Sequence, residues 1–384
     1  MLKAPVLVSF VGGLGGSPVE EMTATARRAA TLDSLERALS TGAFAYAVLV
    51  ADAADGLEAL PAGVRLDLDH GPFHFGRRLA GVIERLGLRS VVYFSGGSVP
   101  LLSAQEFEGV AQELGRGEGR MVTNNYYSAD LVAFSPADAL RRIELPAIDN
   151  PLARLLAEQA GLTTHTLSRS VASQFDIDSP ADLAVLTLVG GAGPRLQALL
   201  DGWGLDVSLY RRILPLFVVS TAQVLVAGRS NSRVWQYLER ETVCRVRFLA
   251  EERGMQAEGR VEGGQARSMV GFYLAAVGVQ RFFETLAELA DAAFLDSRVL
   301  LAHLGLQPSR ADRFLSDLGR YEQIDDPFLR ELTEAAARAA IPVALGGHSL
   351  VSGGLMAIIE HAWQEHDRLV QREEGDVDLG QGVA

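Results

Sequence analysis

The first half of the chain alternates short apolar runs with longer segments of helical character. Strands are predicted at residues 4–11, 44–51, 64–69, 91–94, 121–125, 129–134 and 163–167. Helices are predicted at residues 19–39, 75–86, 103–114, 136–142 and 151–161. Strands that alternate with helices form a mostly parallel sheet covered by helices on both faces. We therefore expect an α/β domain over residues 1–188, where the alternation stops.

The second half has a different pattern. A glycine-rich stretch at residues 189–194 is the best candidate for a linker. Beyond it apolar residues recur at helical spacing, and helices are predicted at residues 234–252, 271–294 and 328–340. The second domain, residues 195–370, is therefore expected to be mainly α-helical, with a role that its sequence does not reveal. The tail at residues 371–384, rich in Glu, Asp and Gly, is expected to be flexible.

The composition excludes some classes of protein. Of the 384 residues, 48% are hydrophobic and 22% are charged, as in ordinary globular proteins with a full core. The formal net charge of −13 argues against nonspecific nucleic-acid binding, which depends on clustered lysine and arginine. The longest apolar stretch is too short and too polar for a spanning helix, and the single cysteine, Cys244, cannot form an intrachain disulfide. We therefore expect a cytoplasmic protein with no nucleic-acid or membrane partner, and leave open whether it forms a homo-oligomer.

Residues 91–103, VVYFSGGSVPLLS, are the centre of the first half. They predict a buried strand, a tight turn and a helix that begins near Ser103. Ligands of open α/β sheets bind outside the carboxyl ends of the strands. Because glycine has no side chain, Gly96 and Gly97 would let the backbone approach such a ligand closely. The alternative is a plain strand-to-helix turn.

A glycine-rich loop follows the first strand and opens a helix. Its glycines are Gly12, Gly13, Gly15 and Gly16. Free N–H groups and the helix dipole at such a place attract anions. The loop is not a dinucleotide fingerprint, since Pro18 stands at the third glycine position, and no Gly-Lys-Ser/Thr follows for a P-loop. A purely structural turn is the alternative.

Two carboxylates, Asp176 and Asp178, are spaced by one residue at a predicted strand end. Alternation along a strand points both to the same face, where they can share a hard cation such as Mg²⁺. Alternatively, Asp178 or Ser179 caps the helix that begins at Pro180. Residues 67 and 69 offer the same spacing, but a solvated strand face is the simpler interpretation there.

The order of these motifs resembles a known family of nucleotidyltransferases. FDIDSPADL, residues 175–183, is close to that family's closing DIDTPEDL, and GSVPLL, residues 97–102, stands where the family has Gly-Asp-x-Pro-Leu-Leu. The family comprises the molybdenum-cofactor guanylyltransferases and phospholactate guanylyltransferases. The resemblance covers about residues 4–188. It implies a glycosyltransferase-A-like fold, a nucleoside triphosphate, Mg²⁺, and transfer of a nucleoside monophosphate to a small phosphorylated acceptor.

The resemblance also implies roles for single residues. The nucleotide-binding candidates are Gly12, Gly13, Gly15, Gly16, Arg27, Gly96, Gly97 and Asn125. The catalytic candidates are Asp176, Asp178 and Ser98, of which the two aspartates would hold the metal. Two departures weaken the catalytic inference. Ser98 replaces the family's metal-binding aspartate, and the first loop carries Glu20 and Glu21 instead of an arginine and a lysine.

Two other functions remain open at this point. A catalytically degenerate domain would bind a nucleotide or sugar nucleotide, while the helical half binds a partner or dimerises. A glycosyltransferase of the same fold would use Asp176 and Asp178 as its metal motif. The loss of the turn aspartate at Ser98 favours the first of these.

A second anion-binding site is a further candidate, in the half without a family resemblance. Residues 341–345 resemble an apolar strand, and the Gly-Gly turn behind them presents His348 and Ser349. Together with Arg229 and Arg253 these residues could receive an anionic ligand. The alternative is a structural histidine in a glycine turn.

Overall fold

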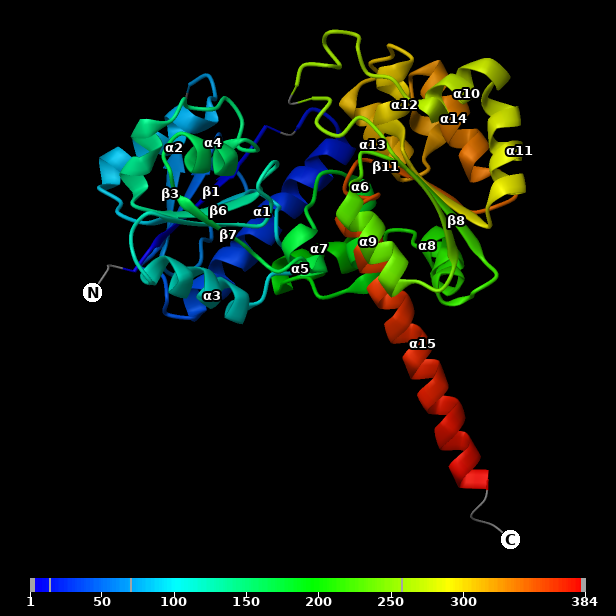
Figure 1. Cartoon of the computed structure of the whole chain (residues 1–384), viewed down its shortest axis with the longest axis horizontal. Coiled ribbons are helices and arrows are strands. Elements are labelled where there is room, and N and C mark those ends of the chain that lie inside the picture. The colour runs from blue at the N-terminus through cyan, green and yellow to red at the C-terminus, as the bar shows by residue number, and fades with distance from the viewer. Residues whose placement is uncertain (1–3, 14, 70, 257, 381–384) are drawn as a thin grey trace. The chain divides into compact units, whose positions relative to one another are not determined.

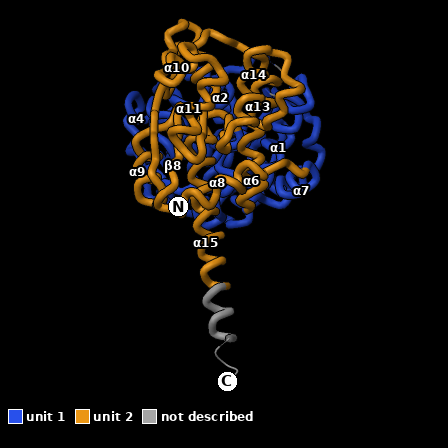
Figure 2. Tube along the Cα trace, turned by 90° about the vertical axis from the view of Figure 1, so that its right-hand side faces the viewer, with its two compact units in different colours: residues 1–177, 191–203 blue, residues 178–190, 204–384 orange. Residues whose placement is uncertain are grey.

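The computed structural model describes residues 4–13, 15–69, 71–256 and 258–380, with only the backbone for residues 373–380 (Figure 1). The chain divides into two compact units, which Figure 2 distinguishes by colour. Unit 1 comprises Met1–Ile177 and Gly191–Trp203, and unit 2 comprises Asp178–Gly190 and Gly204–Ala384.

Unit 1 is built on a seven-stranded sheet in the order β3-β2-β1-β4-β6-β5-β7. Its strands are β1 (Val6–Val11), β2 (Ala47–Ala51), β3 (Val64–Leu68), β4 (Val91–Ser95), β5 (Arg120–Thr123), β6 (Leu131–Ser135) and β7 (Thr163–Thr166). Only β6 runs antiparallel to its neighbours, β4 and β5. The predicted mostly parallel sheet is therefore confirmed.

Helices cover both faces of this sheet. They are α1 (Pro18–Ser40), α2 (Phe75–Leu86), α3 (Ala104–Gly115), η1 (Ala137–Arg142), α4 (Leu152–Glu158), α5 (Val171–Gln174) and α7 (Pro194–Trp203). Successive strand residues point to opposite faces. Val8 accordingly lies in a core cluster with residues of α2 and α4, whereas Leu7 lies in another with residues of α1 and α3.

Unit 2 contains more helix than strand, but it also has a four-stranded parallel sheet in the order β11-β10-β8-β9. The strands are β8 (Gln223–Gly228), β9 (Arg245–Ala250), β10 (Ala292–Asp296) and β11 (Val343–Gly346). The longer helices are α6 (Pro180–Val189), α9 (Ser232–Glu241), α10 (Met269–Val277), α11 (Val279–Leu289), α13 (Arg310–Asp317), α14 (Pro327–Ala337) and α15 (Gly353–Gly380). Short segments are α8 (Ser208–Ile213), η2 (Leu214–Val218), α12 (Ser297–His303) and η3 (Tyr321–Gln323).

Two of the three helices predicted for this half were too long. The helix predicted over residues 234–252 ends at Glu241, and its remainder is β9. The helix predicted over residues 271–294 is α10 and α11, followed by the start of β10. A strand buried on both faces, such as β10, is a continuous apolar run, and periodicity cannot distinguish such a run from buried helix. The third, α14, lies where it was predicted.

The chain passes between the two units at three places, whereas a single boundary was expected at residue 188. The chain enters unit 2 after Ile177, returns to unit 1 at Gly191 and leaves it after Trp203. The motif FDIDSPADL therefore crosses from one unit to the other between its two aspartates. Helix α15 continues to Gly380, into residues expected to form a flexible tail. Among the described residues, no single helix is long and apolar enough to cross a membrane.

Gly96 sets the distance between the turn after β4 and strand β1. Its N–H donates to the carbonyl oxygen of Phe10 at 2.9 Å, and a Cβ at this position would lie 2.4 Å from the same oxygen. Only glycine allows the two backbones to approach this closely.

We predict that Gly96→Ala lowers the free energy of unfolding by about 1–3 kcal/mol, the usual cost of overpacking. Gly81→Ala is the control, because Gly81 lies inside α2 with nothing within 4 Å of the added methyl group. It should stabilise the protein by about 0.5–1 kcal/mol. Urea unfolding of both variants measures the difference. Equal stability of the two variants would contradict the proposed contact.

Candidate functional site

The predicted motifs of unit 1 meet at one edge of its sheet. From β1 the chain builds β2 and β3 on one side and then returns to place β4 on the other side. The order of the strands thus reverses between β1 and β4, and open sheets bind ligands outside the carboxyl ends of strands at such a point. The glycine loop follows β1 and the Gly96-Gly97 turn follows β4, so both motifs lie at this switch point.

Acidic side chains line the glycine loop. The N–H of Gly13 donates to Oδ2 of Asp52 at 2.9 Å, and a Cβ on Gly12 would lie 2.6 Å from the same carboxylate. Ser17 caps α1 by accepting from the N–H of Glu20, whose carboxylate in turn accepts from the Ser17 hydroxyl at 2.8 Å. Carboxylates therefore lie where a triphosphate was predicted to bind.

The remaining glycines of the loop, Gly15 and Gly16, adopt φ angles of +153° and +114°. Side chains rarely adopt these conformations, so glycine is suited to both positions. The nearest atoms to their absent Cβ positions are carboxylate oxygens of Glu21 and Glu20. A polyphosphate would need a cation to overcome the repulsion from these groups.

Arg27 joins α1 to the turn after β4. Its Nε donates to the carbonyl oxygen of Gly96 at 2.9 Å, and its side chain covers Gly97, where a Cβ would lie 2.7 Å from Cγ of Arg27. The N–H of Gly97 donates to the hydroxyl of Thr31 at 3.0 Å. The structure thus brings together three of the predicted nucleotide-binding residues, Arg27, Gly96 and Gly97.

Ser98 and Asp176 face each other in an isolated antiparallel bridge. The N–H of Val99 donates to the carbonyl of Phe175 at 3.1 Å, and the N–H of Ile177 donates to the carbonyl of Gly97 at 3.0 Å. Directly opposed residues of antiparallel segments place their side chains on the same face. Ser98 is 2% exposed, and its hydroxyl donates to the carbonyl of Ser95 at 2.8 Å.

Asp178 belongs to unit 2, two residues after Asp176. Its carboxylate lies 3.1 Å from Nδ1 of His348, and both side chains are about two-fifths exposed, at 41% and 42%. The alternative role for this motif, a helix cap, is confirmed for Ser179, which caps α6 together with Asp182. Asp178 contributes only its N–H, which donates to Oδ2 of Asp182 at 3.0 Å. Its carboxylate is therefore not needed as the cap.

The donor set suits a divalent cation. Asp176 and Asp178 offer the carboxylate oxygens that Mg²⁺ prefers. The imidazole of His348, already beside Asp178, suits Zn²⁺ and other transition metals better than Mg²⁺. The two carboxylates, without the imidazole, are the groups that fit the predicted Mg²⁺. Asp67 and Asp69 instead lie beside Arg78, in keeping with the strand face that was expected for them.

Asn124, which the sequence analysis passed over, is the buried member of the asparagine pair. It is 2% exposed, and its side-chain oxygen accepts from the N–H groups of Asp130 and Leu131, both at 3.1 Å. The predicted ligand Asn125 shapes the turn instead, since its side-chain oxygen accepts from the N–H of Tyr127 at 3.3 Å. Two adjacent asparagines between strands were the only signal for this arrangement.

Tyr93 and Asp149 form a second pair that the sequence did not indicate. The hydroxyl of Tyr93, inside β4, donates to Oδ2 of Asp149 at 2.7 Å. Burial raises the pKa of the Asp149 carboxyl, and the hydrogen bond from Tyr93 offsets only part of this effect. Burial and the charge of Asp149 raise the pKa of Tyr93 well above its ordinary value. The positive charge of Arg27 opposes both pKa shifts.

The four candidates for a second site all lie after strands of unit 2. Arg229 directly follows β8, Arg253 follows β9, and His348 and Ser349 follow β11. Arg229 binds the carboxylate of Asp296 from two nitrogens, at 2.6 Å and 3.1 Å. Arg253 is exposed, whereas Ser349 is 1% exposed. Because the strands are parallel, these residues share the carboxyl edge of the second sheet.

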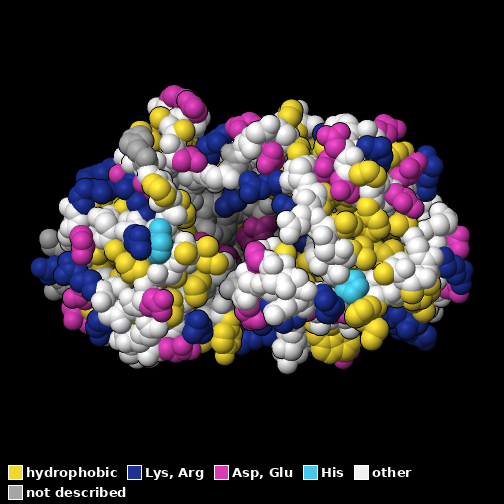
Figure 3. Space-filling view, turned by 90° about the horizontal axis from the view of Figure 1, so that it is seen from above, with side chains coloured by type: hydrophobic (Ala, Val, Ile, Leu, Met, Phe, Trp, Pro, Cys, Tyr) yellow, Lys and Arg dark blue, Asp and Glu magenta, His cyan; other side chains and the backbone are white. Residues whose placement is uncertain are grey.

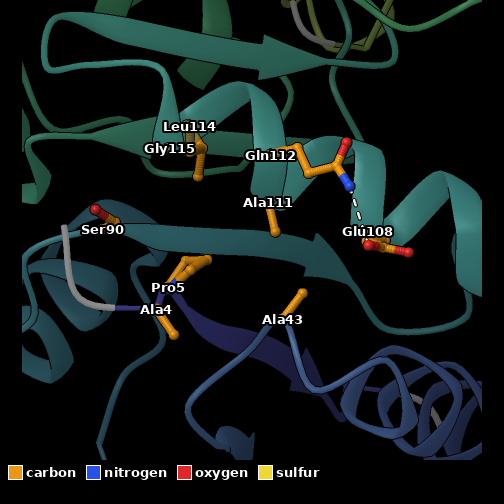
Figure 4. Close-up of a pocket in the computed structure, with 9 residues that line it drawn as sticks. All are labelled: Ala4, Pro5, Ala43, Ser90, Glu108, Ala111, Gln112, Leu114 and Gly115. Carbon is orange, nitrogen blue, oxygen red and sulfur yellow. Dashed lines mark hydrogen bonds between the residues drawn. The ribbon is translucent and has the colours of Figure 1, made fainter. Parts of the chain in front are cut away.

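A hollow of about 210 Å³ lies at the opposite edge of the first sheet (Figure 4). Pro5, Ala43 and Ser90 line it just before β1, β2 and β4 begin, together with residues of α3. Gln112 of α3 donates to Glu108 at 3.0 Å across one wall. None of the site residues predicted from the sequence lines this hollow.

Comparisons with known proteins give structural matches only. No family model and no curated protein matches the sequence. A cytidylyltransferase from Leptospira borgpetersenii is similar at 13% identity and a TM-score of 0.38, over 53% of this chain and 94% of that chain. CMP:2-keto-3-deoxy-manno-octonic acid synthetase is similar at 14% identity and a TM-score of 0.33, over 47% and 95%. The bifunctional IspDF from Campylobacter jejuni is similar at 11% identity and a TM-score of 0.32, over 65% and 93%.

Cytidylyltransferases are nucleotidyltransferases, the kind of protein that the sequence motifs resemble. TM-scores this low carry no weight in assigning an activity. The function proposed below therefore rests on residues of this chain.

Asp149 should make stability depend on pH. Its folded-state pKa lies above the ordinary value of 3.8, so the folded protein binds more protons than the unfolded chain between these two values. As the pH rises from 3.8 to the folded-state pKa of Asp149, the wild type should lose stability relative to Asp149→Asn. Above that pKa, the difference in the free energy of unfolding between the two proteins should stay constant. Thermal unfolding over a series of pH values measures it.

Asp206→Asn is the control of opposite sign. The N–H of Ser208 donates to the Asp206 carboxylate at 2.8 Å and lowers the pKa of that group. The wild type should therefore gain stability relative to this variant as the pH rises from the folded-state pKa to the ordinary one. If the stability difference from the wild type changes with pH in the same direction for both variants, the raised pKa assigned to Asp149 is wrong. It is also wrong if the difference for Asp149→Asn does not change with pH.

Proposed function

We propose that unit 1 binds a nucleoside triphosphate at the β1–β4 switch point and transfers its nucleoside monophosphate to a small phosphorylated acceptor. The observation that carries the proposal is the bridge that sets Asp176 opposite Ser98, beside the two-glycine turn. The bridge supports the proposal because the carboxylate of Asp176 is partly exposed and open α/β sheets bind their ligands outside the carboxyl ends of their strands.

Each residue in this proposal has a physical role. Asp176 and Asp178 hold Mg²⁺, which neutralises phosphate charge when it is bound. Arg27 donates to Gly96 through Nε only, and its terminal nitrogens can contact phosphate oxygens. Gly96 and Gly97 let the turn lie against the Phe10 carbonyl and the Arg27 side chain, which holds Arg27 beside the turn. The rate would come mainly from positioning and from electrostatic stabilisation of the transferred group.

A catalytically degenerate nucleotide-binding protein is the second candidate, and two observations favour it. Ser98 brings no charge to the metal position, and its hydroxyl is already bonded to the Ser95 carbonyl. Asp52 already accepts from the N–H of Gly13 in the glycine loop. Release of pyrophosphate separates the two functions, because the degenerate protein would bind the nucleotide without turnover.

We predict that one of GTP, CTP, ATP or UTP raises the melting temperature of the full chain, and only with Mg²⁺. Asp176→Asn should weaken this Mg²⁺-dependent binding about 10–100-fold, since even residues behind metal ligands change metal affinity by that factor. Its melting temperature without ligand should stay near that of the wild type, because the carboxylate is needed for the metal rather than for packing.

Asp201→Asn is the matched control, since Asp201 is an exposed residue on α7. It should keep the wild-type response to the nucleotide. The proposed function is wrong if no nucleotide shifts the melting temperature. It is also wrong if Asp176→Asn loses several degrees without ligand and keeps its affinity, because Asp176 would then be structural.

A further inference from the structure

The second sheet has its own topological switch point. Its strand order is β11-β10-β8-β9. Strand β9 lies on one side of β8, and β10 and β11 lie on the other side. All its pairings are parallel. The winding reverses between β8 and β10, so a ligand of this sheet is expected outside their carboxyl ends.

The ends of β8 and β10 lie in close contact at this point. Gly228 ends β8 with a φ of +140°, and a Cβ there would lie 2.2 Å from Cβ of Asp296 at the end of β10. The glycine lets Arg229 reach both oxygens of Asp296. Ser230 then donates to the carbonyl of Val351 at 2.8 Å, which ties the loop after β8 to the loop after β11.

Two ion pairs at the carboxyl edge of the second sheet each have a buried carboxylate and a more exposed arginine. Arg229 pairs with Asp296, and Arg298 pairs with Asp317 of α13. Both carboxylate side chains are 0% exposed, whereas the arginine side chains are 16% and 13% exposed. The carboxylates are therefore sealed inside, and the solvent-facing side of each pair is the guanidinium.

Donors remain on both guanidinium groups. Arg229 uses Nε and Nη2 for Asp296, which leaves Nη1. Arg298 uses Nη1 and Nη2 for Ser297 and Asp317, which leaves Nε. A Cβ on Gly347 would lie 3.9 Å from Nε of Arg298 and 4.0 Å from Nη2 of Arg229. Because Gly347 has no side chain, the space beside both guanidinium groups is left open at this position.

Arg313, one turn before Asp317 on α13, adds a third positive charge. Within the described part of the chain it makes no hydrogen bond or ion pair. Burial and the neighbouring charges of Arg298 and Arg310 lower the pKa of its guanidinium, and Arg229 contributes in the same sense. Arginines 229, 298 and 313 thus lie near one another, with Asp296, Asp317 and Asp182 as the carboxylates whose charges act on Arg298. On the face that Figure 3 shows, basic and acidic side chains are interspersed.

We propose that the carboxyl edge of the second sheet is a separate binding site for a phosphate-bearing small molecule, with Arg313 as its main contact and Arg229 and Arg298 as further donors. Guanidinium N–H groups match the geometry of phosphate oxygens, and the anion would relieve the repulsion among the three arginines. Its three arginines all belong to unit 2.

Titration calorimetry of the full chain with inorganic phosphate, without Mg²⁺, tests this proposal. Arg313→Gln should weaken phosphate binding about tenfold or more, the effect of one charge-assisted hydrogen bond. Its melting temperature without phosphate should be equal to or higher than that of the wild type, because repulsion is removed. Gly347→Ala should also weaken binding, since its methyl group would lie beside the guanidinium groups while leaving every charge in place.

Two controls locate the effect. Arg320→Gln removes an exposed arginine just beyond α13 and should keep wild-type affinity. Asp201→Asn changes an exposed carboxylate on α7 of unit 1 and should also keep it. The proposal is overturned if the wild type binds no phosphate, if Arg313→Gln binds it as tightly, or if either control loses affinity to the same extent.

Discussion

Two backbone hydrogen bonds hold residues 175–177 beside the turn after β4, and the candidate site of unit 1 depends on them. They set Asp176 opposite Ser98 and bring the end of a distant segment to the switch point between β1 and β4. Gly96 lets the backbone of the same turn pack directly against the Phe10 carbonyl of β1. Glycine and backbone geometry, more than any charged side chain, therefore position the site.

Electrostatics distinguish the two units. In unit 1, Asp52 and Glu20 lie at the loop where a phosphate was expected, so any polyphosphate there needs a cation. In unit 2, the carboxylates of Asp296 and Asp317 are buried behind arginines, whereas Asp178 beside His348 is partly exposed.

The first unit was predictable in outline because its signals are local. Apolar runs gave the strands, and Ser17 with Pro18 and Ser103 with Glu106 mark the starts of α1 and α3. The second sheet was missed because β10 is a buried run without alternation, and because β9 is an edge strand that follows α9 after a short break. The roles of Asn124 and Asp149 depend on partners that residue spacing does not reveal.

The sequence by itself determined the alternation that makes a mostly parallel sheet, the two glycine motifs and the spacing of Asp176 and Asp178. These features are local, since each depends on neighbouring residues and on the periodicity of strands and helices. Only the tertiary structure decided that Ser98 opposes Asp176, that Asp178 meets His348, and that Arg313 makes no ion pair with any described residue. Such contacts join segments that the sequence separates, and packing of whole sheets and helices, rather than local propensity, brings them together.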